Sequence, residues 1–296
     1  MSKKNKRSVL LVVDGHNMIY RGYYATLYSG GMSNKEGNET GAIKGFMNIF
    51  MADFKKIGAT HCVVVFDRPG LNFRHRLYPE YKATREKGDD AVSLTPQVNT
   101  LRHLLKALGV RVIGIKGEEG DDLIGSTAVS LASEFDQVII DSRDKDFASL
   151  ITDKIWQMLP KEMPKGIDGV VERFGVQPNQ MIDYLMLVGD SVDNIPGVYK
   201  VAGKTAAKLL NEYGSLRNIV KNKDSFTPAL KKNLTEAIPQ FKLTKKLITI
   251  ATDRLPDLTK EDTALVEVDQ KSLKRICKDL DFQTTYQQML KFRAVG

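Results

Sequence analysis

The stretch SVLLVVDG, residues 8–15, decides the fold. Its unbroken run of aliphatic and β-branched side chains is typical of a strand buried on both faces, and the run stops at Asp14-Gly15. Three later runs have the same character, and acidic residues follow each of them within a few positions. These runs are Cys62–Phe66 (CVVVF), Val110–Ile115 (VRVIGI) and Gln137–Ile140 (QVII).

Helical patterns lie between the expected strands. Thr95-Pro96 has the chemistry of an N-cap followed by a first-turn proline, so we expect one helix to start at Pro96. Strands that alternate with helices of this length predict βαβ units, and hence an α/β fold with a mainly parallel central sheet covered by helices. The expected helices are Glu39–Lys56, Pro96–Leu108 and Asp121–Phe135.

Two segments depart from this alternation. Residues 71–95 are polar, basic and aromatic without a strand pattern, which indicates an inserted helical segment. Beyond about residue 181 the chain becomes a series of short lysine-rich helices, with turn signals at Pro196-Gly197 and Gly203. We therefore expect an α/β core at 1–180, a helical subdomain at 181–260, and a C-terminal segment at 261–296 that packs back on the core.

Composition excludes several classes of protein. The 296 residues are 42% hydrophobic and 27% charged, which is typical of a globular chain rather than a disordered one. Only two cysteines occur, Cys62 and Cys277, so neither a disulfide framework nor a thiolate zinc site is expected. The first apolar run breaks at Asp14, too early for a signal sequence or a membrane span. We expect a cytoplasmic monomer without a membrane segment, and the net charge of +8 favours a polyanionic partner.

Acidic residues gather where the expected strands end, and the carboxyl ends of parallel strands meet at one edge of a sheet. So many carboxylates repel one another unless cations neutralise them, and two groups of oxygen donors suit two Mg²⁺ ions that clamp a phosphoryl displacement. Any single member is explained as simply by a helix cap or a turn, so only the joint pattern predicts a metal site. The set is Asp14, Asp67, Glu119, Asp121, Asp122, Asp144 and Asp146.

The motifs resemble those of the bacterial and phage 5′-nucleases, the flap endonuclease family, which includes the N-terminal nuclease domain of DNA polymerase I. They occur in family order between about residues 8 and 260, and together they are highly specific. The matching segments are VDGHN (13–17), VFD (65–67), FR (73–74), YKATR (81–85), EEGDD (118–122), SRDKD (142–146) and GDSVDNIPG (189–197).

The resemblance implies a PIN-like core and two metal sites. The first would use Asp14, Asp67, Glu119 and Asp121, with Asp122 nearby, and the second would use Asp144, Asp146, Asp190 and Asp193. It implies two Mg²⁺ ions, for which Mn²⁺ can substitute. One ion would position and activate water, and the other would stabilise the departing 3′ oxygen.

The resemblance also implies contacts with DNA from residues 71–95, which would form a helical arch that admits a single-stranded 5′ end. Lys82 and Arg85 would act on the scissile phosphate, Tyr81 would stack on the terminal base, and Arg74 would contact DNA. Arg21 is a further candidate for a phosphate contact. The simpler alternative for this segment is a solvated charged loop.

The segment GKT at 203–205 is not a P-loop, because the first glycine of that motif and the preceding strand are both missing. The family has a helix-hairpin-helix here, which grips duplex phosphates through backbone amides. Its expected contacts are Gly197, Val198, Lys200, Gly203, Lys204 and Thr205. The family usually has Gly-Ile-Gly where this chain has Lys200-Val201-Ala202, which leaves a K⁺ ion at the hairpin an open question.

Three functions are weighed on these grounds. The first is a structure-specific 5′ nuclease, both 5′-3′ exonuclease and flap endonuclease, acting as a separate protein in Okazaki fragment processing and DNA repair. Its partner would be DNA with 5′ flaps, overhangs or nicks, with RNA primer strands as a further substrate. The second is a PIN-like ribonuclease, which should be smaller and lack the arch and the hairpin. The third is a module that binds flaps without cutting.

Overall fold

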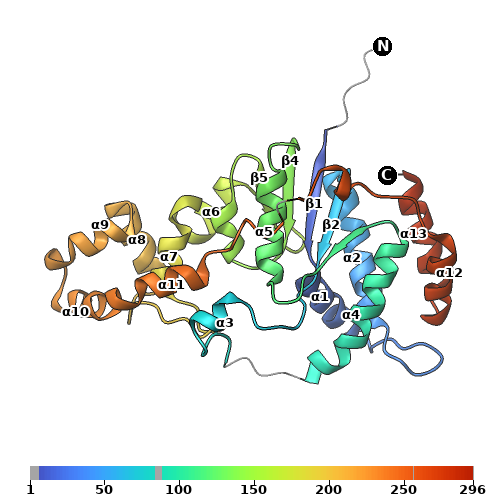
Figure 1. Ribbon diagram of the computed structural model, residues 1–296, viewed down its shortest axis with the longest axis horizontal. Helices are drawn as coiled ribbons and strands as arrows, with labels where there is room; N and C mark the ends of the chain where they lie inside the picture. Colours follow the sequence, from blue (N-terminus) through green and yellow to red (C-terminus); the bar gives the residue numbers. More distant parts are fainter. Residues whose placement is uncertain (1–6, 84–88, 256, 296) are drawn as a thin grey trace, which may run out of the picture.

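The computed structural model describes residues 7–83, 89–255 and 257–295 (Figure 1). Its centre is a parallel five-stranded sheet in the order β3-β2-β1-β4-β5. The expected parallel α/β sheet is therefore confirmed, and one short strand, β5, is added at its edge. The strands are β1 (Val9–Asp14), β2 (His61–Val65), β3 (Arg111–Ile113), β4 (Gln137–Asp141) and β5 (Ile155–Met158).

Helices cover both faces of the sheet (Figure 1). The helices of the core are α1 (Gly15–Leu27), α2 (Gly41–Ile57), α3 (Phe73–Leu77), α4 (Asp89–Ala107), α5 (Gly120–Leu131) and α6 (Ile167–Phe174). Those of the helical subdomain are α7 (Met181–Val188), α8 (Gly203–Tyr213), α9 (Leu216–Lys221), α10 (Pro228–Ala237) and α11 (Phe241–Ile248). The last two are α12 (Gln270–Asp279) and α13 (Gln283–Val295).

Strand β1 shows why the sheet is covered on both sides. Side chains alternate along a strand, so Leu10 and Val12 join one core with α5 and the helical subdomain. Leu11 and Val13 point the other way and join a second core with α1, α2 and α4. The continuous apolar run of β1 thus contributes side chains to two cores, which fixes this strand at the centre of the sheet.

Helix α4 corrects the expected start at Pro96, because the helix begins at Asp89 and the proline lies inside it. An internal proline loses one backbone hydrogen bond and crowds the preceding turn. The buried side chains of Leu94 and Leu101 lie on either side of Pro96 along the chain, and the Gln97 amide oxygen accepts a hydrogen bond from Ala42 N. Packing against α2 therefore outweighs the local preference to start the helix at the proline.

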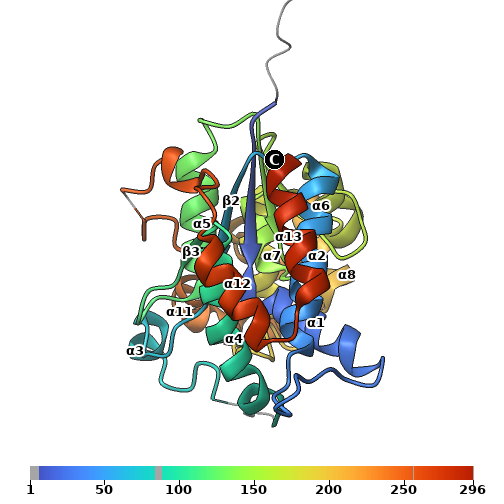
Figure 2. The same cartoon turned by 90° about the vertical axis from the view of Figure 1, so that its right-hand side faces the viewer.

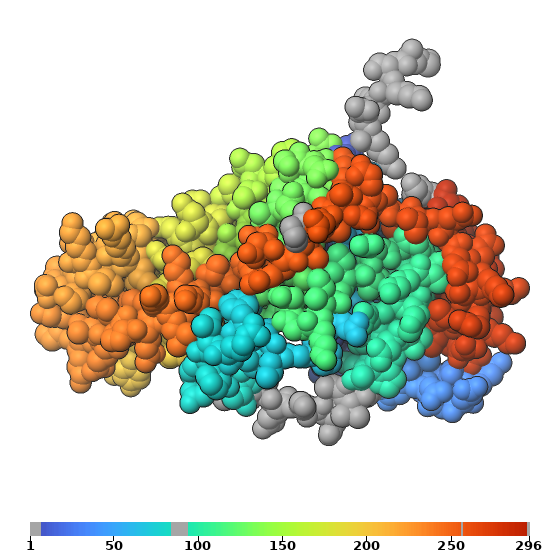
Figure 3. Space-filling model, in the orientation of Figure 1, coloured from blue at the N-terminus to red at the C-terminus, as the bar shows by residue number. Residues whose placement is uncertain are grey.

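The helical subdomain extends to one side of the core, and α12 and α13 stand at the opposite side against α4 and α2 (Figures 1 and 2). The segment after α11 returns across the core over α5, as the space-filling view shows (Figure 3). Ala251 N donates to Asp122 Oδ1 and Arg254 N donates to Ser126 Oγ, which fixes this return to α5. At the far end, Phe292 of α13 contacts Phe54 of α2.

Two further observations concern the chain as a whole. Cys62 and Cys277 are both buried free thiols. Across the described ranges, none of the helices combines the length and the apolar character that crossing a bilayer requires.

Candidate active site at the carboxyl edge of the sheet

Asp14 is both the last residue of β1 and the N-cap of α1. One carboxylate oxygen accepts a hydrogen bond from Asn17 N at 2.9 Å, and the other accepts one from Ser142 Oγ at 2.8 Å. Burial raises the pKa of Asp14 to about 6, assisted by the negative charge of Asp67 and opposed by the two hydrogen bonds. Asp14 can therefore cap α1 and also belong to the candidate site.

Asp67 lies beside Asp14 at the end of the neighbouring strand. Its Oδ1 accepts from Gly120 N at 2.6 Å, and its Oδ2 lies 3.2 Å from His16 Nδ1. Desolvation at the site opposes ionisation, but the hydrogen bond and charge of His16, followed by the Gly120 amide, lower the pKa of Asp67 to about 2. His16 and the Gly120 amide therefore favour the ionised form of Asp67.

Glu119 is the most heavily contacted carboxylate of the edge. Its Oε1 accepts hydrogen bonds from Asn72 Nδ2 and Lys82 Nζ, both at 2.7 Å. Its Oε2 accepts from Arg74 Nη1 at 2.8 Å and from the Tyr81 hydroxyl at 3.2 Å. All four partners come from residues 72–82, so this side chain holds the base of the expected arch to the acidic edge at several points.

Asp121 and Asp122 are neighbours in the chain but point to different places. Burial, followed by the charges of Asp144, Asp14 and Asp67, raises the pKa of Asp121 well above its usual range, which places it among the site carboxylates. Asp122 is fully buried, and its oxygens accept from Arg74 and from Ala251 N. Successive residues on a helix are rotated by about 100°, so Asp122 faces away, and the expectation of a metal ligand there is not supported.

Asp144 and Asp146 lie in the turn after β4. Asp146 N donates to Asp144 Oδ1 at 2.9 Å, and within the described ranges Asp146 Oδ1 is buried without a hydrogen-bond partner. Burial, followed by the charge of Asp144, raises the pKa of Asp146 to about 7. A buried carboxylate oxygen without a donor is a position that suits a cation.

Asp190 and Asp193 belong to a tight turn in which Asp190 pairs with Ile195 and Asn194 adopts a left-handed φ of 56°. Asp190 Oδ2 accepts a hydrogen bond from Lys145 Nζ at 2.7 Å. Asp193 Oδ2 accepts one from the Tyr81 hydroxyl at 3.2 Å. The single proton of the Tyr81 hydroxyl is therefore shared between Asp193 and Glu119, one carboxylate from each expected group.

The carboxylates lie at one edge of the sheet but do not form a complete set of ligands for a metal ion. Among the residues that the structure describes, no three acidic, histidine or cysteine side chains are gathered closely enough to hold one metal ion. Lys82, Arg74 and Lys145 instead neutralise Glu119, Asp122 and Asp190. The chemistry of the donors fits a hard divalent cation nonetheless, because the charges of Asp14, Asp67 and Asp144 act on Asp121 and one buried oxygen, on Asp146, lacks a donor.

The structure does not support Arg74 and Tyr81 as direct DNA contacts. Arg74 is 2% exposed, and its guanidinium donates to Glu119, to Asp122 and to the carbonyls of Leu247 and Thr249. Tyr81 is 4% exposed and its hydroxyl is engaged with two carboxylates. Both side chains organise the site from inside.

Arg21 is an expected phosphate contact, and Arg85 and Lys82 are expected to act on the scissile phosphate. Arg21 donates to Asp141 Oδ1 at 2.9 Å and lies 3.7 Å from Asp53, so it is already paired and largely buried. Arg85 falls outside the described residues. Lys82 donates from its ammonium to Glu119 Oε1 and from its backbone N–H to Asp193 O, and its action on the scissile phosphate stays a prediction.

The expected hairpin contacts include one buried amide, at Val198, and the amides of the first turn of α8. Val198 is buried, and its N–H donates to Leu187 O, so this amide is not available to DNA. Gly203, Lys204 and Thr205 form the first turn of α8, where Ala202 provides no side-chain cap. The amides of such a turn, together with the helix dipole, favour an anion.

Gly197 and Lys200 have backbone roles of their own. A Cβ on Gly197 would lie 2.5 Å from Gly189 N, so two chain segments meet too closely there for any side chain. Lys200 adopts a left-handed φ of 61°, which is the conformation that a glycine favours. A glycine at this position would adopt the same conformation without strain.

Sequence reasoning assigned no role to three further residues of the site. Ser142 contacts Asp14, Asn72 contacts Glu119, and Lys145 contacts Asp190. Ser142 and Lys145 lie inside the quoted SRDKD motif, so the sequence contained a motif from which their place in the site could have been inferred. Asn72 precedes the quoted FR motif and was not distinguishable from an ordinary helix cap.

Two family models match the chain. Residues 9–175 match the model described as 5′-3′ exonuclease, N-terminal resolvase-like domain. Residues 176–271 match the model described as 5′-3′ exonuclease, C-terminal SAM fold. The boundary between them lies just before α7.

Curated relatives agree with these models. The chain is 32% identical to a 5′-3′ exonuclease of Aquifex aeolicus over 95% of both proteins. It is 33% identical to DNA polymerase I of Bacillus subtilis over 96% of this chain, but it spans only 32% of that polymerase.

Solved structures share the fold. A T5 5′-exonuclease structure with bound divalent zinc ions superposes with a TM-score of 0.70 at 19% identity, covering 96% of this chain and 99% of that one. Flap endonuclease-1 from Methanococcus jannaschii superposes with a TM-score of 0.64 at 16% identity, covering 99% and 94%.

Proposed function

The chain belongs to the 5′-3′ exonuclease family, and from that premise we propose that it is a structure-specific 5′ nuclease that hydrolyses DNA at junctions between single and double strands. Its activities are 5′-3′ exonuclease and flap endonuclease. Its place in the cell is the removal of flaps and RNA primers during lagging-strand replication and repair.

One observation carries the proposal. Lys82, at the base of the expected arch, places its ammonium 2.7 Å from Glu119 Oε1 and 3.9 Å from Asp193 Oδ2. A cation from the arch therefore stands between one carboxylate of each group. A phosphate drawn to this cation would lie against the acidic edge, where hydrolysis needs metal ions to offset the negative charge.

Two Mg²⁺ ions are the proposed cofactors, with Mn²⁺ as a substitute, and such a pair supplies an activated water and stabilisation of the departing 3′ oxygen. Asp14, Asp67, Glu119 and Asp121 would hold the first ion. Asp144, Asp146, Asp190 and Asp193 would hold the second. Ser142 orients Asp14 through its 2.8 Å hydrogen bond, and Asn72 orients Glu119.

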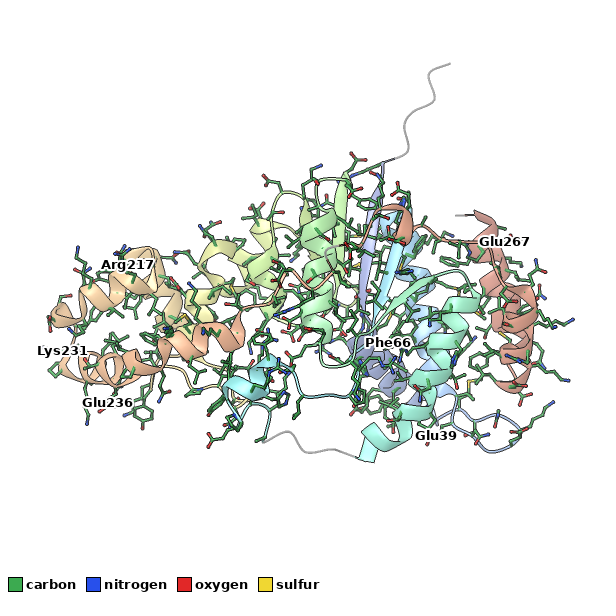
Figure 4. All side chains as sticks on the ribbon, viewed as in Figure 1. Glu39, Phe66, Arg217, Lys231, Glu236 and Glu267 are labelled. Carbon is green, nitrogen blue, oxygen red and sulfur yellow. The ribbon has the colours of Figure 1, made fainter. Side chains whose placement is uncertain are left out.

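The helical subdomain is the proposed duplex-binding surface. Lys204 and Thr205 are exposed at the start of α8, where backbone amides can meet a phosphate. Arg217 and Lys231 lie further out on the same subdomain (Figure 4). This distribution suits contact with a phosphate backbone without reading its sequence.

The test is cleavage of a labelled 5′-flap DNA with and without Mg²⁺. We expect metal-dependent cutting by the unmodified protein and its loss in Asp14→Ala and Asp193→Ala. Asp168→Ala is the matched control, because Asp168 is an exposed residue at the start of α6 outside the site. No metal-dependent cutting by the unmodified protein would end the nuclease proposal. Cutting of single-stranded RNA without preference for a junction would favour the PIN-like ribonuclease, and flap binding without cutting would favour the binding module.

A further inference from the structure

Each of the two carboxylate groups already contains a lysine ammonium. Lys82 Nζ lies 2.7 Å from Glu119 Oε1 in the first group. Lys145 Nζ lies 2.7 Å from Asp190 Oδ2 in the second. Both side chains are partly enclosed, with 18% and 34% of their surface exposed, so neither is an ordinary surface lysine.

The local structure holds the ammonium groups of Lys82 and Lys145 close to the site carboxylates. Lys82 adopts a left-handed φ of 58°, its N–H donates to Asp193 O, and its ammonium lies 4.8 Å from the Tyr81 ring centre. A lysine in that conformation is held by its surroundings, because local sterics disfavour it. Lys145 stands between Asp144 and Asp146 in the chain and reaches across to Asp190.

An ammonium and a hydrated divalent ion attract the same carboxylate oxygens, but the ammonium carries a single positive charge. Without a cation, carboxylates this close would repel one another and spread apart. With a divalent ion in place, a lysine at the same oxygens is a like charge at close range, which costs free energy even when solvent screens it.

We propose that Lys82 and Lys145 are internal counter-cations, which hold the two carboxylate groups together before metal binds and compete with the entering ions for the same oxygens. Both are positioning residues in this role, and the inference rests on the proposed two-metal function. It goes further by assigning to Lys145 the control of affinity at the second site. A divalent ion that enters must displace the ammonium from Asp190, so the lysine weakens metal binding.

Whether the loss of Lys145 strengthens or weakens metal binding distinguishes competition with the metal from a merely structural role. If Lys145 only supported the fold, its loss would loosen Asp190 and weaken metal binding. If it competes with the metal, its loss strengthens binding. A like charge within about 5 Å of a divalent ion predicts a change of about tenfold or more.

The experiment measures Mn²⁺ binding to the full chain without DNA, by the electron paramagnetic resonance of free Mn²⁺. Lys145→Met should bind one ion about tenfold or more tightly than the unmodified protein, and Lys145→Arg should not. Lys165→Met is the matched control, because Lys165 forms a 2.8 Å pair with Glu172 and, among the residues that the structure describes, its ion pairs are with Glu162 and Glu172 and not with a site carboxylate. It should leave both affinities unchanged.

The outcomes are distinguishable. Absence of Mn²⁺ binding by the unmodified protein would overturn the proposed metal sites and this inference together. Two bound ions in the unmodified protein, with unchanged or weaker binding in folded Lys145→Met, would overturn the inference and leave the proposed function standing. Lys82→Met makes the same test at the first group if Lys145→Met does not fold, and weaker binding there would equally count against it.

Discussion

Arg74 and Asp122 form a buried two-pronged ion pair, with Nη1 2.6 Å from Oδ2 and Nη2 2.8 Å from Oδ1. The remaining guanidinium contacts reach Glu119 and the carbonyls of Leu247 and Thr249. One side chain therefore ties the base of the arch, the start of α5 and the end of the helical subdomain together.

Arg74→Ala should destabilise the protein by about 3–5 kcal/mol, because it leaves the Asp122 carboxylate buried without its partner. Arg74→Lys should recover only part of this loss, since an ammonium cannot reproduce the planar fork. Urea unfolding of both variants measures the change. A loss below about 1 kcal/mol in Arg74→Ala would show that the pair does not hold these elements together.

Lys82→Ala should slow flap cleavage far more than it weakens duplex binding, because the ammonium lies at the acidic edge, between Glu119 and Asp193, and not in the first turn of α8 that is proposed to bind the duplex. Single-turnover rates and DNA binding in Ca²⁺ measure the two effects separately. Equal losses in rate and affinity would remove Lys82 from its role at the scissile phosphate.

Metal affinity should rise with pH between about 5 and 8. The pKa values of Asp14 and Asp146 are about 6 and about 7 without metal, so protons compete with the ion below that range. Calorimetry in two buffers of different ionisation enthalpy should show protons released on Mg²⁺ binding near pH 6.5. Affinity independent of pH would mean that neither carboxyl group is a ligand.

The same raised pKa values predict the stability of the metal-free protein. A carboxyl group whose folded pKa exceeds its unfolded pKa contributes stability below about pH 4, and this contribution is lost as the pH rises through the folded value. Asp146→Asn should therefore be more stable than the unmodified protein by more than about 1 kcal/mol at pH 8 in EDTA. At pH 5 the difference should be clearly smaller, because part of the loss occurs only as the pH rises further towards the folded pKa, and a difference of the same size at both pH values would exclude titration as the cause.

Lys200→Gly should separate the backbone role of this position from its charge. Glycine adopts the left-handed conformation without strain, so stability should rise by up to about 1 kcal/mol. DNA binding should weaken for all sequences, and its salt dependence should fall by about one phosphate contact. Unchanged binding at low salt would show that Lys200 lies outside the DNA surface.

The sequence by itself determined the sheet and the location of the acidic edge. Long apolar runs such as residues 8–13 are stable only when buried on both faces, and parallel strands must end at a common edge. The acids after those strands therefore converge whatever the details of packing. The short strand β5 escaped prediction, since four residues with a polar glutamine carry little periodicity.

Only the tertiary structure decided what each charged side chain contacts. Asp121 and Asp122 have the same chemistry, but the rotation of α5 directs one to the site and the other to Arg74. Arg74 and Tyr81 look like surface contacts for DNA in the sequence, yet burial turns them into internal supports. Burial and pairing depend on segments as distant as residues 247 and 249, and no local pattern in the chain encodes contacts of that range.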